Sequence, residues 1–418
     1  MKRMQIVGGN ILEGTIKVSG AKNSAVALVP ASLLSDGIVK IENVPNISDI
    51  DALNEILEYL GAKIVKKDGY MEIDSSSIEN KEIPESISKK LRASYYFMSA
   101  LLGKYKHVTM HFPGGCSIGA RPIDQTLKGY RALGATVIEE GDKFTIFADE
   151  LKGGHVYLDM PSVGATINTM LASVKAKGKT IIENAAKEPE IVSIATFLNN
   201  MGAKITGAGT SEITIIGVDK LGDCYTEVIP DRIEAGTYII AGALMGNNLK
   251  VTNIIPEHVE TLLLKLKEAG VNLEVKEDEV IISKTDNLKA INIKTLGYPG
   301  FPTDLQQPLT TFLTQCNGVS TLEETIYENR FKNVEYLNNM GANIELITNQ
   351  KIEVTGPTVL KGAEVVATDL RAGACLVLAA LKAEGTTTIT DIEHVLRGYE
   401  NITEKLSNVG AKIEIEEI

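Results

Sequence analysis

One cysteine of the chain stands where a thiol could do chemistry rather than pack in a core. Cys116 lies in the segment HFPGGCSIGARP, residues 111–122, directly behind two glycines and a proline and five residues before Arg121. Glycine and proline at this density predict a loop, because glycine reaches backbone angles that other residues avoid. Cys375, in ACLVLAA, has instead the apolar neighbours of a core cysteine. From these residues alone, a loop with an incidental thiol and a loop with a reactive thiol are equally good interpretations.

A second set of candidate residues recurs at the predicted starts of helices. Its members are polar and stand at the head of an apolar stretch: Lys22, Asn23, Arg92, Ser162, Asp231, Arg232, Thr303, Asp304, Asp369 and Arg371. Four of them, Lys22, Arg92, Ser162 and Arg232, follow one another at intervals of 70 residues. This spacing indicates equivalent positions in repeated units.

Cations are unexpected at these positions. The N-terminus of a helix carries about half a positive charge, so a cation there loses about 0.3–1 kcal/mol where an acid would gain it. Selection for stability alone favours Ser, Asp or Thr at this place. A bound anion would resolve the conflict, since the helix dipole, the backbone N–H groups and the side-chain cation would all point at it. The alternative is that each cation turns away to solvent. That alternative explains a single cation well, but it explains several cations at equivalent repeat positions less well. We therefore expect the helix ends to converge on a cleft between domains that binds phosphates and carboxylates.

The elements that position these residues belong to an internal repeat. A short phrase recurs as LGAKI, LGATV, MGAKI, AGVNL, MGANI and VGAKI, with its glycines at Gly61, Gly134, Gly202, Gly270, Gly341 and Gly410. The intervals between these glycines are 73, 68, 68, 71 and 69 residues. Periodicity this regular predicts six copies of one structural unit.

Each copy is predicted to hold two helices and several strands. Leu53, Ile56, Leu57 and Leu60 follow helical spacing before the first phrase, and the stretch 259–266 does so before the fourth. Glycine then ends the helix, and an alternating strand follows. An earlier helix leads through a turn into a strand, as in 172–185, so each unit reads as helix, strand, helix, strand, with a further strand where the sequence alternates again. Six units predict an α/β protein of two three-unit domains, with the break near residues 227–236 and no long linker.

Composition limits the class of partner. The chain of 418 residues is 44% hydrophobic and 23% charged, as in a globular protein, and its 42 basic against 54 acidic residues give a net charge of -12. That balance argues against nucleic-acid and anionic-membrane surfaces. No signal-peptide stretch and no run of 18 apolar residues is present, which predicts a cytoplasmic protein without membrane insertion. Nothing in the sequence predicts an oligomeric state.

Motifs for common cofactors are missing from the sequence. Neither the GxxxxGK[ST] phosphate loop nor the dinucleotide fingerprint occurs, so ATP and NAD are not expected. The four cysteines Cys116, Cys224, Cys316 and Cys375 form no CxxC pair and no metal-ligand spacing with the five histidines. We expect free thiols in a reducing compartment, no metal and no cofactor.

Ten segments together resemble one family. They are SGAKN from Ser19, LRAS from Leu91, PGGCSIGARPID from Pro113, SVGAT from Ser162, ENAAKEPEIV from Glu183, PDRIEAGT from Pro230, FPTDLQ from Phe301, ETIYENRF from Glu324, TDLRAGA from Thr368 and RGYE from Arg397. Over essentially its full length the chain resembles the UDP-N-acetylglucosamine enolpyruvyl transferases. The resemblance implies an inside-out α/β barrel of two similar domains, each of three βαβαββ-type units. Residues 20–229 would form the first domain, with the Cys116 loop, and residues 1–19 plus 230–418 the second, with the active site in the cleft between them.

The same resemblance implies a reaction. Enolpyruvyl would pass from phosphoenolpyruvate to the 3′-hydroxyl of UDP-N-acetylglucosamine with release of phosphate, which is the first committed step of peptidoglycan synthesis. Cys116 would protonate the methylene carbon of phosphoenolpyruvate, and it would be the thiol that the epoxide fosfomycin alkylates. Arg121 would tune that thiol, and Asp304 would accept the proton of the sugar hydroxyl. The glycines would let the loop close over the bound sugar nucleotide and exclude water.

Binding residues are implied position by position. Those for the phosphoenolpyruvate anion are Lys22, Asn23, Arg92, Arg121 and Arg397. Those for the sugar nucleotide are Arg121, Pro122, Ile123, Asp124, Gln125, Met160, Pro161, Ser162, Val163 and Ile326. Asp369 and Arg371 belong to the same cleft. Met160-Pro161 departs from the Lys-Val of the family's usual form, which leaves the uridine contacts there open.

Two other functions are compatible with part of the pattern. A 3-phosphoshikimate enolpyruvyl transferase has the same fold and chemistry, but its family lacks the cysteine loop. A non-catalytic repeat protein that binds sugar nucleotides would explain the cations, yet it would not require an exposed thiol together with Asp304.

Overall fold

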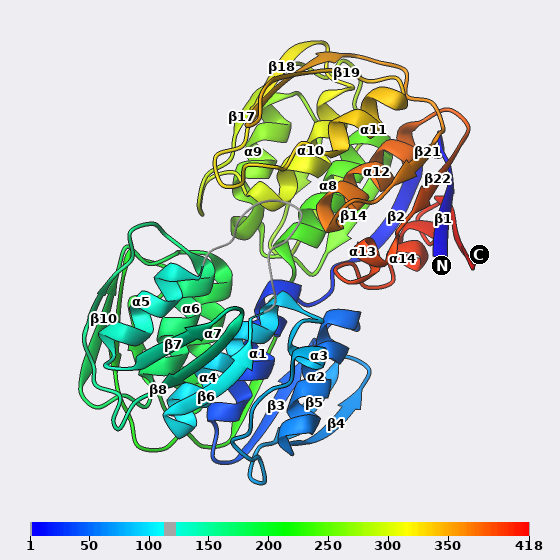
Figure 1. Cartoon of the computed structure of the whole chain (residues 1–418). Coiled ribbons are helices and arrows are strands. Elements are labelled where there is room, and N and C mark those ends of the chain that lie inside the picture. The colour runs from blue at the N-terminus through cyan, green and yellow to red at the C-terminus, as the bar shows by residue number, and fades with distance from the viewer. Residues whose placement is uncertain (1, 113–122, 418) are drawn as a thin grey trace. The chain divides into compact units, whose positions relative to one another are not determined.

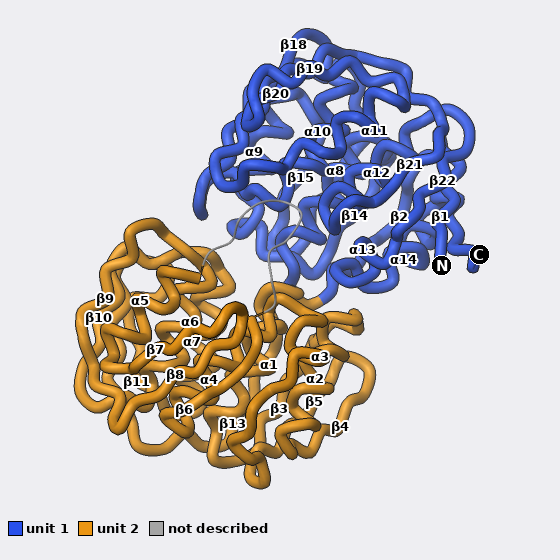
Figure 2. Tube along the Cα trace, viewed as in Figure 1, with its two compact units in different colours: residues 1–19, 116–119, 230–418 blue, residues 20–115, 120–229 orange. Residues whose placement is uncertain are grey.

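The computed structural model describes residues 2–112 and 123–417. Three predicted site residues, Cys116, Arg121 and Pro122, lie outside the described residues. The described residues separate into two compact units (Figure 2). Unit 1 contains residues 2–19 and 230–417, and unit 2 contains residues 20–112 and 123–229. Nowhere in these two units is a helix both long enough and apolar enough to cross a membrane.

The six-fold repeat predicted from the glycine phrase is confirmed. Each repeat opens with a helix, here called its first helix: α1 (Lys22–Ala31), α4 (Tyr96–Tyr105), α6 (Val163–Ser173), α8 (Arg232–Met245), α10 (Gln306–Leu313) and α12 (Leu370–Lys382). These helices are buried on nearly every side, and every residue of α10 is buried, including its two Gln and two Thr residues. A helix of that kind belongs in the middle of a layered structure. Accordingly α8, α10 and α12 pack against one another in unit 1, and α4 packs against both α1 and α6 in unit 2 (Figure 1).

The second helix of each repeat ends one to three residues before the predicted glycine. These helices are α2 (Ser48–Leu60), α5 (Asp124–Ala132), α7 (Pro189–Asn200), α9 (Glu260–Glu268), α11 (Asn333–Asn339) and α14 (Ile402–Ser407). The six glycines that follow them all have positive φ, between +86° and +106°. Side chains other than hydrogen are strained in that left-handed region, so glycine is the residue that can end the helix in this way. Leu53, Ile56, Leu57 and Leu60 of α2 are buried, as their spacing predicts.

Short helices fill the connections. They are α3 (Glu85–Ser88) and α13 (Glu393–Leu396), with the 3-10 helices η1 (Ser32–Leu34), η2 (Arg92–Tyr95), η3 (Pro256–Val259) and η4 (Thr303–Leu305). Two predicted helix starts therefore belong to 3-10 turns, since Arg92 opens η2 ahead of α4 and Asp304 lies in η4 ahead of α10. In the predicted helical stretch 259–266, Val259 likewise ends η3 and α9 begins only at Glu260.

The strands of unit 2 form three sheets. Their orders are β13 (Cys224–Glu227), β3 (Ile38–Glu42), β5 (Tyr70–Asp74), β4 (Lys63–Lys67); then β9 (His155–Tyr157), β10 (Lys179–Glu183), β12 (Glu212–Ile216), β11 (Lys204–Thr206); and β6 (His107–His111), β8 (Lys143–Phe147), β7 (Thr136–Glu140). In the third sheet Ile83 forms a parallel bridge to Met110 of β6, where the other two sheets have a parallel strand.

The strands of unit 1 form three sheets with the same order. They are β2 (Leu12–Lys17), β14 (Gly246–Thr252), β16 (Glu279–Ile282), β15 (Leu273–Val275); then β17 (Asn292–Lys294), β18 (Gly318–Glu323), β20 (Lys351–Gly356), β19 (Asn343–Thr348); and β21 (Glu364–Val366), β22 (Thr386–Thr390), β1 (Lys2–Val7), β23 (Lys412–Glu417). The predicted α/β class is confirmed. In the described part of the chain the strands make separate sheets rather than one closed sheet.

The N-terminal strands complete repeats that begin much later in the sequence. β1 pairs antiparallel with both β22 and β23, and it occupies the place that β5 or β20 has in its own sheet. The sixth repeat needs this strand because no strand follows β23 in the described chain. β2 pairs parallel with β14, and β13, after the third repeat, pairs parallel with β3 of the first. Unit 2 is thus completed by a strand from its own C-terminal end, and unit 1 by two strands from the N-terminal residues 2–19.

Candidate active site

Asp304 is held by two buried arginines in unit 1. Arg330 donates a hydrogen bond from Nη2 to Oδ1 of Asp304 at 2.6 Å, and Arg371 donates from Nη2 to Oδ2 at 2.9 Å. The side chains of Arg330 and Arg371 are only 2% and 6% exposed, whereas that of Asp304 is 26% exposed. The two arginines therefore bind the carboxylate from within unit 1, while part of the Asp304 side chain remains exposed to solvent.

These arginines set the charge state of the carboxyl group. Burial raises the pKa of Asp304, but the charges of Arg371 and Arg330 outweigh burial and hold that pKa well below its usual range. Asp304 is therefore ionised at neutral pH and has the capacity to accept a proton. It is a weak base while both guanidinium groups are bound to it, so its strength depends on what else the arginines contact.

Two further acids of unit 1 cap helices. Asp231 Oδ1 accepts hydrogen bonds from the backbone N–H groups of Ile233 and Glu234, at 2.8 and 3.0 Å, and so caps α8. Asp369 Oδ1 accepts from the N–H groups of Arg371 and Ala372, at 2.8 and 2.9 Å, at the start of α12. Oδ2 of Asp369 is buried and has no hydrogen-bond partner among the described residues. That oxygen is available to a group that the described residues do not supply.

The predicted anion-binding residues of unit 2 lie at helix starts. Lys22 is the first residue of α1, where Ala21 provides no side-chain cap, and its Nζ forms an ion pair of 2.6 Å with Asp49 of α2. Asn23 follows it and is half-buried. Arg92 opens η2 and places its guanidinium over the ring of Phe112, 5.1 Å from the ring centre. An acid within the unit thus already meets the charge of Lys22.

The predicted sugar-nucleotide residues of unit 2 gather at the starts of α5 and α6. Gln125 donates from Nε2 to the carboxylate of Asp159 at 3.0 Å and accepts from the backbone N–H of the same residue at 2.8 Å. Lys128 forms an ion pair with Asp159 at 2.7 Å. Ser162 caps α6 through the N–H of Ala165 at 3.2 Å. The amide of Gln125 therefore joins the start of α5 to the segment before α6.

The remaining predicted residues are partly or fully exposed. In unit 2, Met160 is 60% exposed. The other unit 2 residues outside the network just described are half-buried or exposed: Ile123, Asp124, Pro161 and Val163. In unit 1, Ile326 is 43% exposed and its backbone N–H donates to Glu324 at 2.8 Å. Arg232 lies over the ring of Tyr298, and half-buried Arg397 follows α13.

Sequence reasoning overlooked two contributors to these clusters. Arg330 lies in the segment ETIYENRF, but no periodicity or charge pattern there indicated that it would be a partner of Asp304. Asp49 stands in the first turn of α2, where an acid is expected as a response to the helix dipole, and its pairing with Lys22 gave no separate signal.

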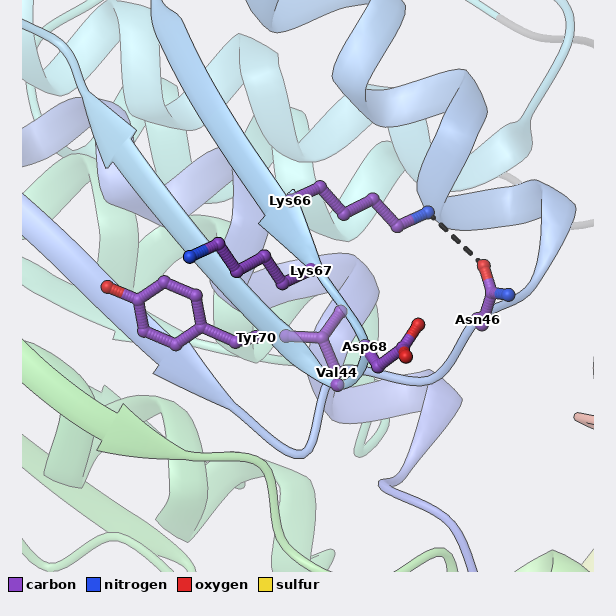
Figure 3. Close-up of a pocket in the computed structure, with 7 residues that line it drawn as sticks. Val44, Asn46, Lys66, Lys67, Asp68 and Tyr70 are labelled. Atoms are coloured by element: carbon purple, nitrogen blue, oxygen red, sulfur yellow. Dashed lines mark hydrogen bonds between the residues drawn. The ribbon is translucent and has the colours of Figure 1, made fainter.

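A hollow elsewhere in unit 2 holds none of the predicted site residues. It lies beside the β4–β5 hairpin and is lined by Val44, Asn46, Lys66, Lys67, Asp68, Gly69 and Tyr70 (Figure 3). Lys66, drawn there with its hydrogen bond to Asn46, also forms an ion pair with Asp51 at 2.7 Å. Nothing in this lining resembles the arrangement around Asp304.

Thiols and metal ligands can be assessed for the described residues. Cys224, Cys316 and Cys375 are free and buried, and burial raises the pKa of the Cys375 thiol to about 11. These three are therefore core residues, as predicted for Cys375. In residues 2–112 and 123–417, no group of three or more His, Cys, Asp or Glu side chains is arranged to hold a metal ion.

Comparison with known families decides which protein class contains this site. Residues 6–406 match the family described as EPSP synthase (3-phosphoshikimate 1-carboxyvinyltransferase). The chain belongs to this family. The enolpyruvyl transferase NikO from Streptomyces tendae superposes on it with a TM-score of 0.90 at 27% identity, covering 99% of both chains. EPSP synthase from Acinetobacter baumannii superposes with a TM-score of 0.77 at 19% identity over 100% of both chains, which supports the fold.

Relatives of higher identity carry a more specific name. The UDP-N-acetylglucosamine 1-carboxyvinyltransferase 2 of Geobacillus kaustophilus is 55% identical over 413 residues, which are 99% of this chain and 96% of the relative. The protein of the same name from Bacillus subtilis is 51% identical over 414 residues, again 99% and 96%. The similarity therefore spans both units and all six repeats.

Proposed function

We propose that this enzyme transfers the enolpyruvyl group of phosphoenolpyruvate to the 3′-hydroxyl of UDP-N-acetylglucosamine, with release of phosphate, in the first committed step of peptidoglycan synthesis. The observation that carries the proposal is the identity of 51–55% with UDP-N-acetylglucosamine 1-carboxyvinyltransferases over 99% of the chain. The alternative acceptor, 3-phosphoshikimate, is supported by the family description alone, since the EPSP synthase that superposes is only 19% identical.

The addition step of the reaction needs one proton donor and one proton acceptor, and the elimination step then removes one further proton. A proton is added to the methylene carbon of phosphoenolpyruvate while the sugar oxygen bonds to the adjacent carbon and gives up its own proton. Loss of phosphate and of a proton from the methyl group then restores the double bond. In this proposal Cys116, outside the described residues, donates the first proton, and Asp304 accepts the proton of the sugar hydroxyl.

The arginines around Asp304 supply a way to adjust its basicity. Arg330 and Arg371 hold the pKa of Asp304 low by direct pairing. A substrate carboxylate that pairs with the same guanidinium groups partly neutralises their charge, which weakens their effect on Asp304, and the pKa of Asp304 then rises. The base would gain strength when phosphoenolpyruvate is bound, which is when a base is needed.

Other residues are assigned to substrate binding. Lys22, Asn23, Arg92, Arg121 and Arg397 hold the phosphoenolpyruvate anion. Asp369, with one buried oxygen that lacks a partner among the described residues, belongs to the same site. The residues around Gln125 and Ser162, with Ile326, receive the sugar nucleotide.

The finer architecture is part of the same proposal. The two units, each with three repeats of one sheet order around buried first helices, are the two domains of an inside-out α/β barrel. Buried helices at the centre with sheets outside them support this arrangement within each unit.

Phosphate release tests the function directly. The protein is incubated with phosphoenolpyruvate and UDP-N-acetylglucosamine, with the sugar omitted in one control and 3-phosphoshikimate supplied in its place in another. We expect release only with UDP-N-acetylglucosamine. Release with 3-phosphoshikimate instead would establish the alternative activity, and no release with either would leave a binding protein.

The role of Cys116 has its own test. Aspartate is an acid of similar reach whose pKa a desolvated site raises and Arg121 lowers, whereas the serine hydroxyl is far too weak an acid. Cys116→Asp is expected to retain substantial turnover with a lower pH optimum and to escape fosfomycin. Cys116→Ser should lose about 10²-fold or more. If both variants are equally inactive, the thiol acts in another way than as a general acid.

A further inference from the structure

Another carboxylate of unit 1, that of the buried Glu324, lies next to the Asp304 cluster and forms no ion pair with its charged groups. Glu324 follows β18 and is 1% exposed. Its Oε1 accepts hydrogen bonds from the Thr295 hydroxyl at 3.0 Å and from the backbone N–H groups of Ile326 and Tyr327 at 2.8 and 3.2 Å. Its Oε2 accepts one hydrogen bond, from the Thr303 hydroxyl at 2.8 Å.

Thr303 connects this carboxylate to the proposed base. Arg330 donates from Nη1 to the Thr303 hydroxyl and from Nη2 to Asp304. A hydroxyl has one hydrogen to donate. Because Thr303 gives that hydrogen to Glu324, its oxygen lone pairs face Arg330. The carboxylate can only accept, so it fixes the direction of the whole chain from Arg330 through Thr303 to Glu324.

The other oxygen of Glu324 shapes the backbone that carries Ile326. Thr295 is fully buried, and its hydroxyl donates to Glu324 while accepting from the N–H of Thr325 at 2.9 Å. Residues 325–327 are thus fixed by hydrogen bonds to one carboxylate and one hydroxyl. The exposed side chain of Ile326 is displayed from this turn.

We infer that Glu324 is a positioning residue for the proposed transfer: through Thr303 it orients Arg330, and with it Asp304, and through the turn at 325–327 it places Ile326. The inference rests on the proposed function. A buried carboxylate that serves two groups of donors on separate segments fixes their relative geometry, and catalytic geometry is sensitive to displacements of about 1 Å, which cost up to ~10²-fold in rate.

Replacement by glutamine separates the two roles. Gln has one acceptor oxygen, and that oxygen is needed on the side where Thr295, Ile326 and Tyr327 all donate. Its NH2 group must then face Thr303, where it donates to the hydroxyl oxygen that already accepts from Arg330 and leaves the hydroxyl hydrogen without its acceptor. Glu324→Gln therefore keeps the turn at 325–327 and reverses the direction of the hydrogen bond between residue 324 and Thr303, on which the orientation of Arg330 depends.

The test measures steady-state phosphate release from phosphoenolpyruvate and UDP-N-acetylglucosamine. For Glu324→Gln we expect kcat to fall by ~10- to 100-fold with little change in KM for UDP-N-acetylglucosamine. The matched control is Glu323→Gln, the neighbour on β18 whose ion pair with Lys294 at 2.9 Å is exposed, and its kcat should stay within about twofold of the unmodified protein.

Variants at Thr303 distinguish positioning from general destabilisation. Thr303→Val removes the hydroxyl and should lower kcat, and Thr303→Ser, which keeps the hydroxyl, should retain far more of it. Glu324→Gln added to Thr303→Val should cost little more, because the link is already broken.

Two results would overturn the role of Glu324 in an active enzyme. One is a fall in kcat on Glu324→Gln that is as large in Thr303→Val as in the unmodified protein. The other is equal activity of Thr303→Val and Thr303→Ser, a comparison that does not depend on whether a Glu324 variant folds. Absence of phosphate release by the unmodified protein would instead overturn the proposed function and this role with it.

Discussion

The first helices of the two units differ in how their N-termini are capped. In unit 1, α8 and α12 are capped by Asp231 and Asp369, each of which accepts two backbone N–H hydrogen bonds. In unit 2, α1 begins with Lys22 and has no side-chain cap, and α6 is capped by a single bond to Ser162. The same repeat thus has an acidic cap before α8 and α12, where Arg232 and Arg371 follow the cap, and a cation without a side-chain cap at the start of α1.

The difference separates two tasks. An acid at a helix N-terminus is stabilised by the dipole and completes the helix, whereas a cation there is disfavoured by about 0.3–1 kcal/mol unless an anion pairs with it. Unit 2 meets the charge of Lys22 with Asp49, and unit 1 meets the charge of Asp304 with two arginines. We take unit 1 to supply the proton acceptor and unit 2 to supply an anion site whose internal acid a substrate can displace.

The largest expected effect comes from removing the proton acceptor proposed for unit 1. Asp304→Asn keeps the shape of the side chain but cannot take up a proton, so kcat should fall by ~10²–10⁴-fold. Because the amide oxygen of the new side chain can still accept a hydrogen bond, binding of UDP-N-acetylglucosamine, measured by calorimetry, should change little. Near-normal turnover would remove Asp304 from the role of base.

A smaller effect tests the anion site of unit 2. Lys22→Ala should weaken phosphoenolpyruvate binding by about 10- to 100-fold, the usual value of a hydrogen bond to a charged group, and UDP-N-acetylglucosamine binding by less. Asp49→Asn removes the internal competitor and should tighten phosphoenolpyruvate binding. If Lys22 and Asp49 form only a structural pair, calorimetry will show no such opposite signs, and both variants will simply lower the free energy of unfolding.

The smallest effect compares the caps themselves. Asp231→Ala removes two hydrogen bonds and Ser162→Ala removes one, at 3.2 Å. Each variant should lower the free energy of unfolding by about 0.5–2 kcal/mol, and the loss should be larger for Asp231→Ala. Asp231→Asn is the control, since Asn caps helices as well as Asp. Urea unfolding monitored by circular dichroism measures all three. Equal losses for the two alanine variants would mean that the two caps contribute alike.

Much of the repeat architecture could be predicted because it depends on local chemistry. The six glycines end helices because glycine adopts the left-handed backbone angle without the strain that other residues meet there, and all six have that angle. The apolar spacing of α2 likewise led directly to its buried face. That the N-terminal residues belong to the second domain was expected only through the family resemblance, and no pattern in residues 2–7 indicated that β1 pairs with β22 and β23.

The sequence by itself determined which polar residue types stand at which repeat positions: a cation at the head of α1, an acid in η4, acids before α8 and α12. Only the tertiary structure decided their partners. Arg330 and Arg371 are 26 and 67 residues from Asp304, and Lys22 meets an acid on the next helix. Helix ends and turns follow from neighbouring residues, whereas an ion pair between distant segments exists only where packing of the repeats brings both charges within hydrogen-bond distance.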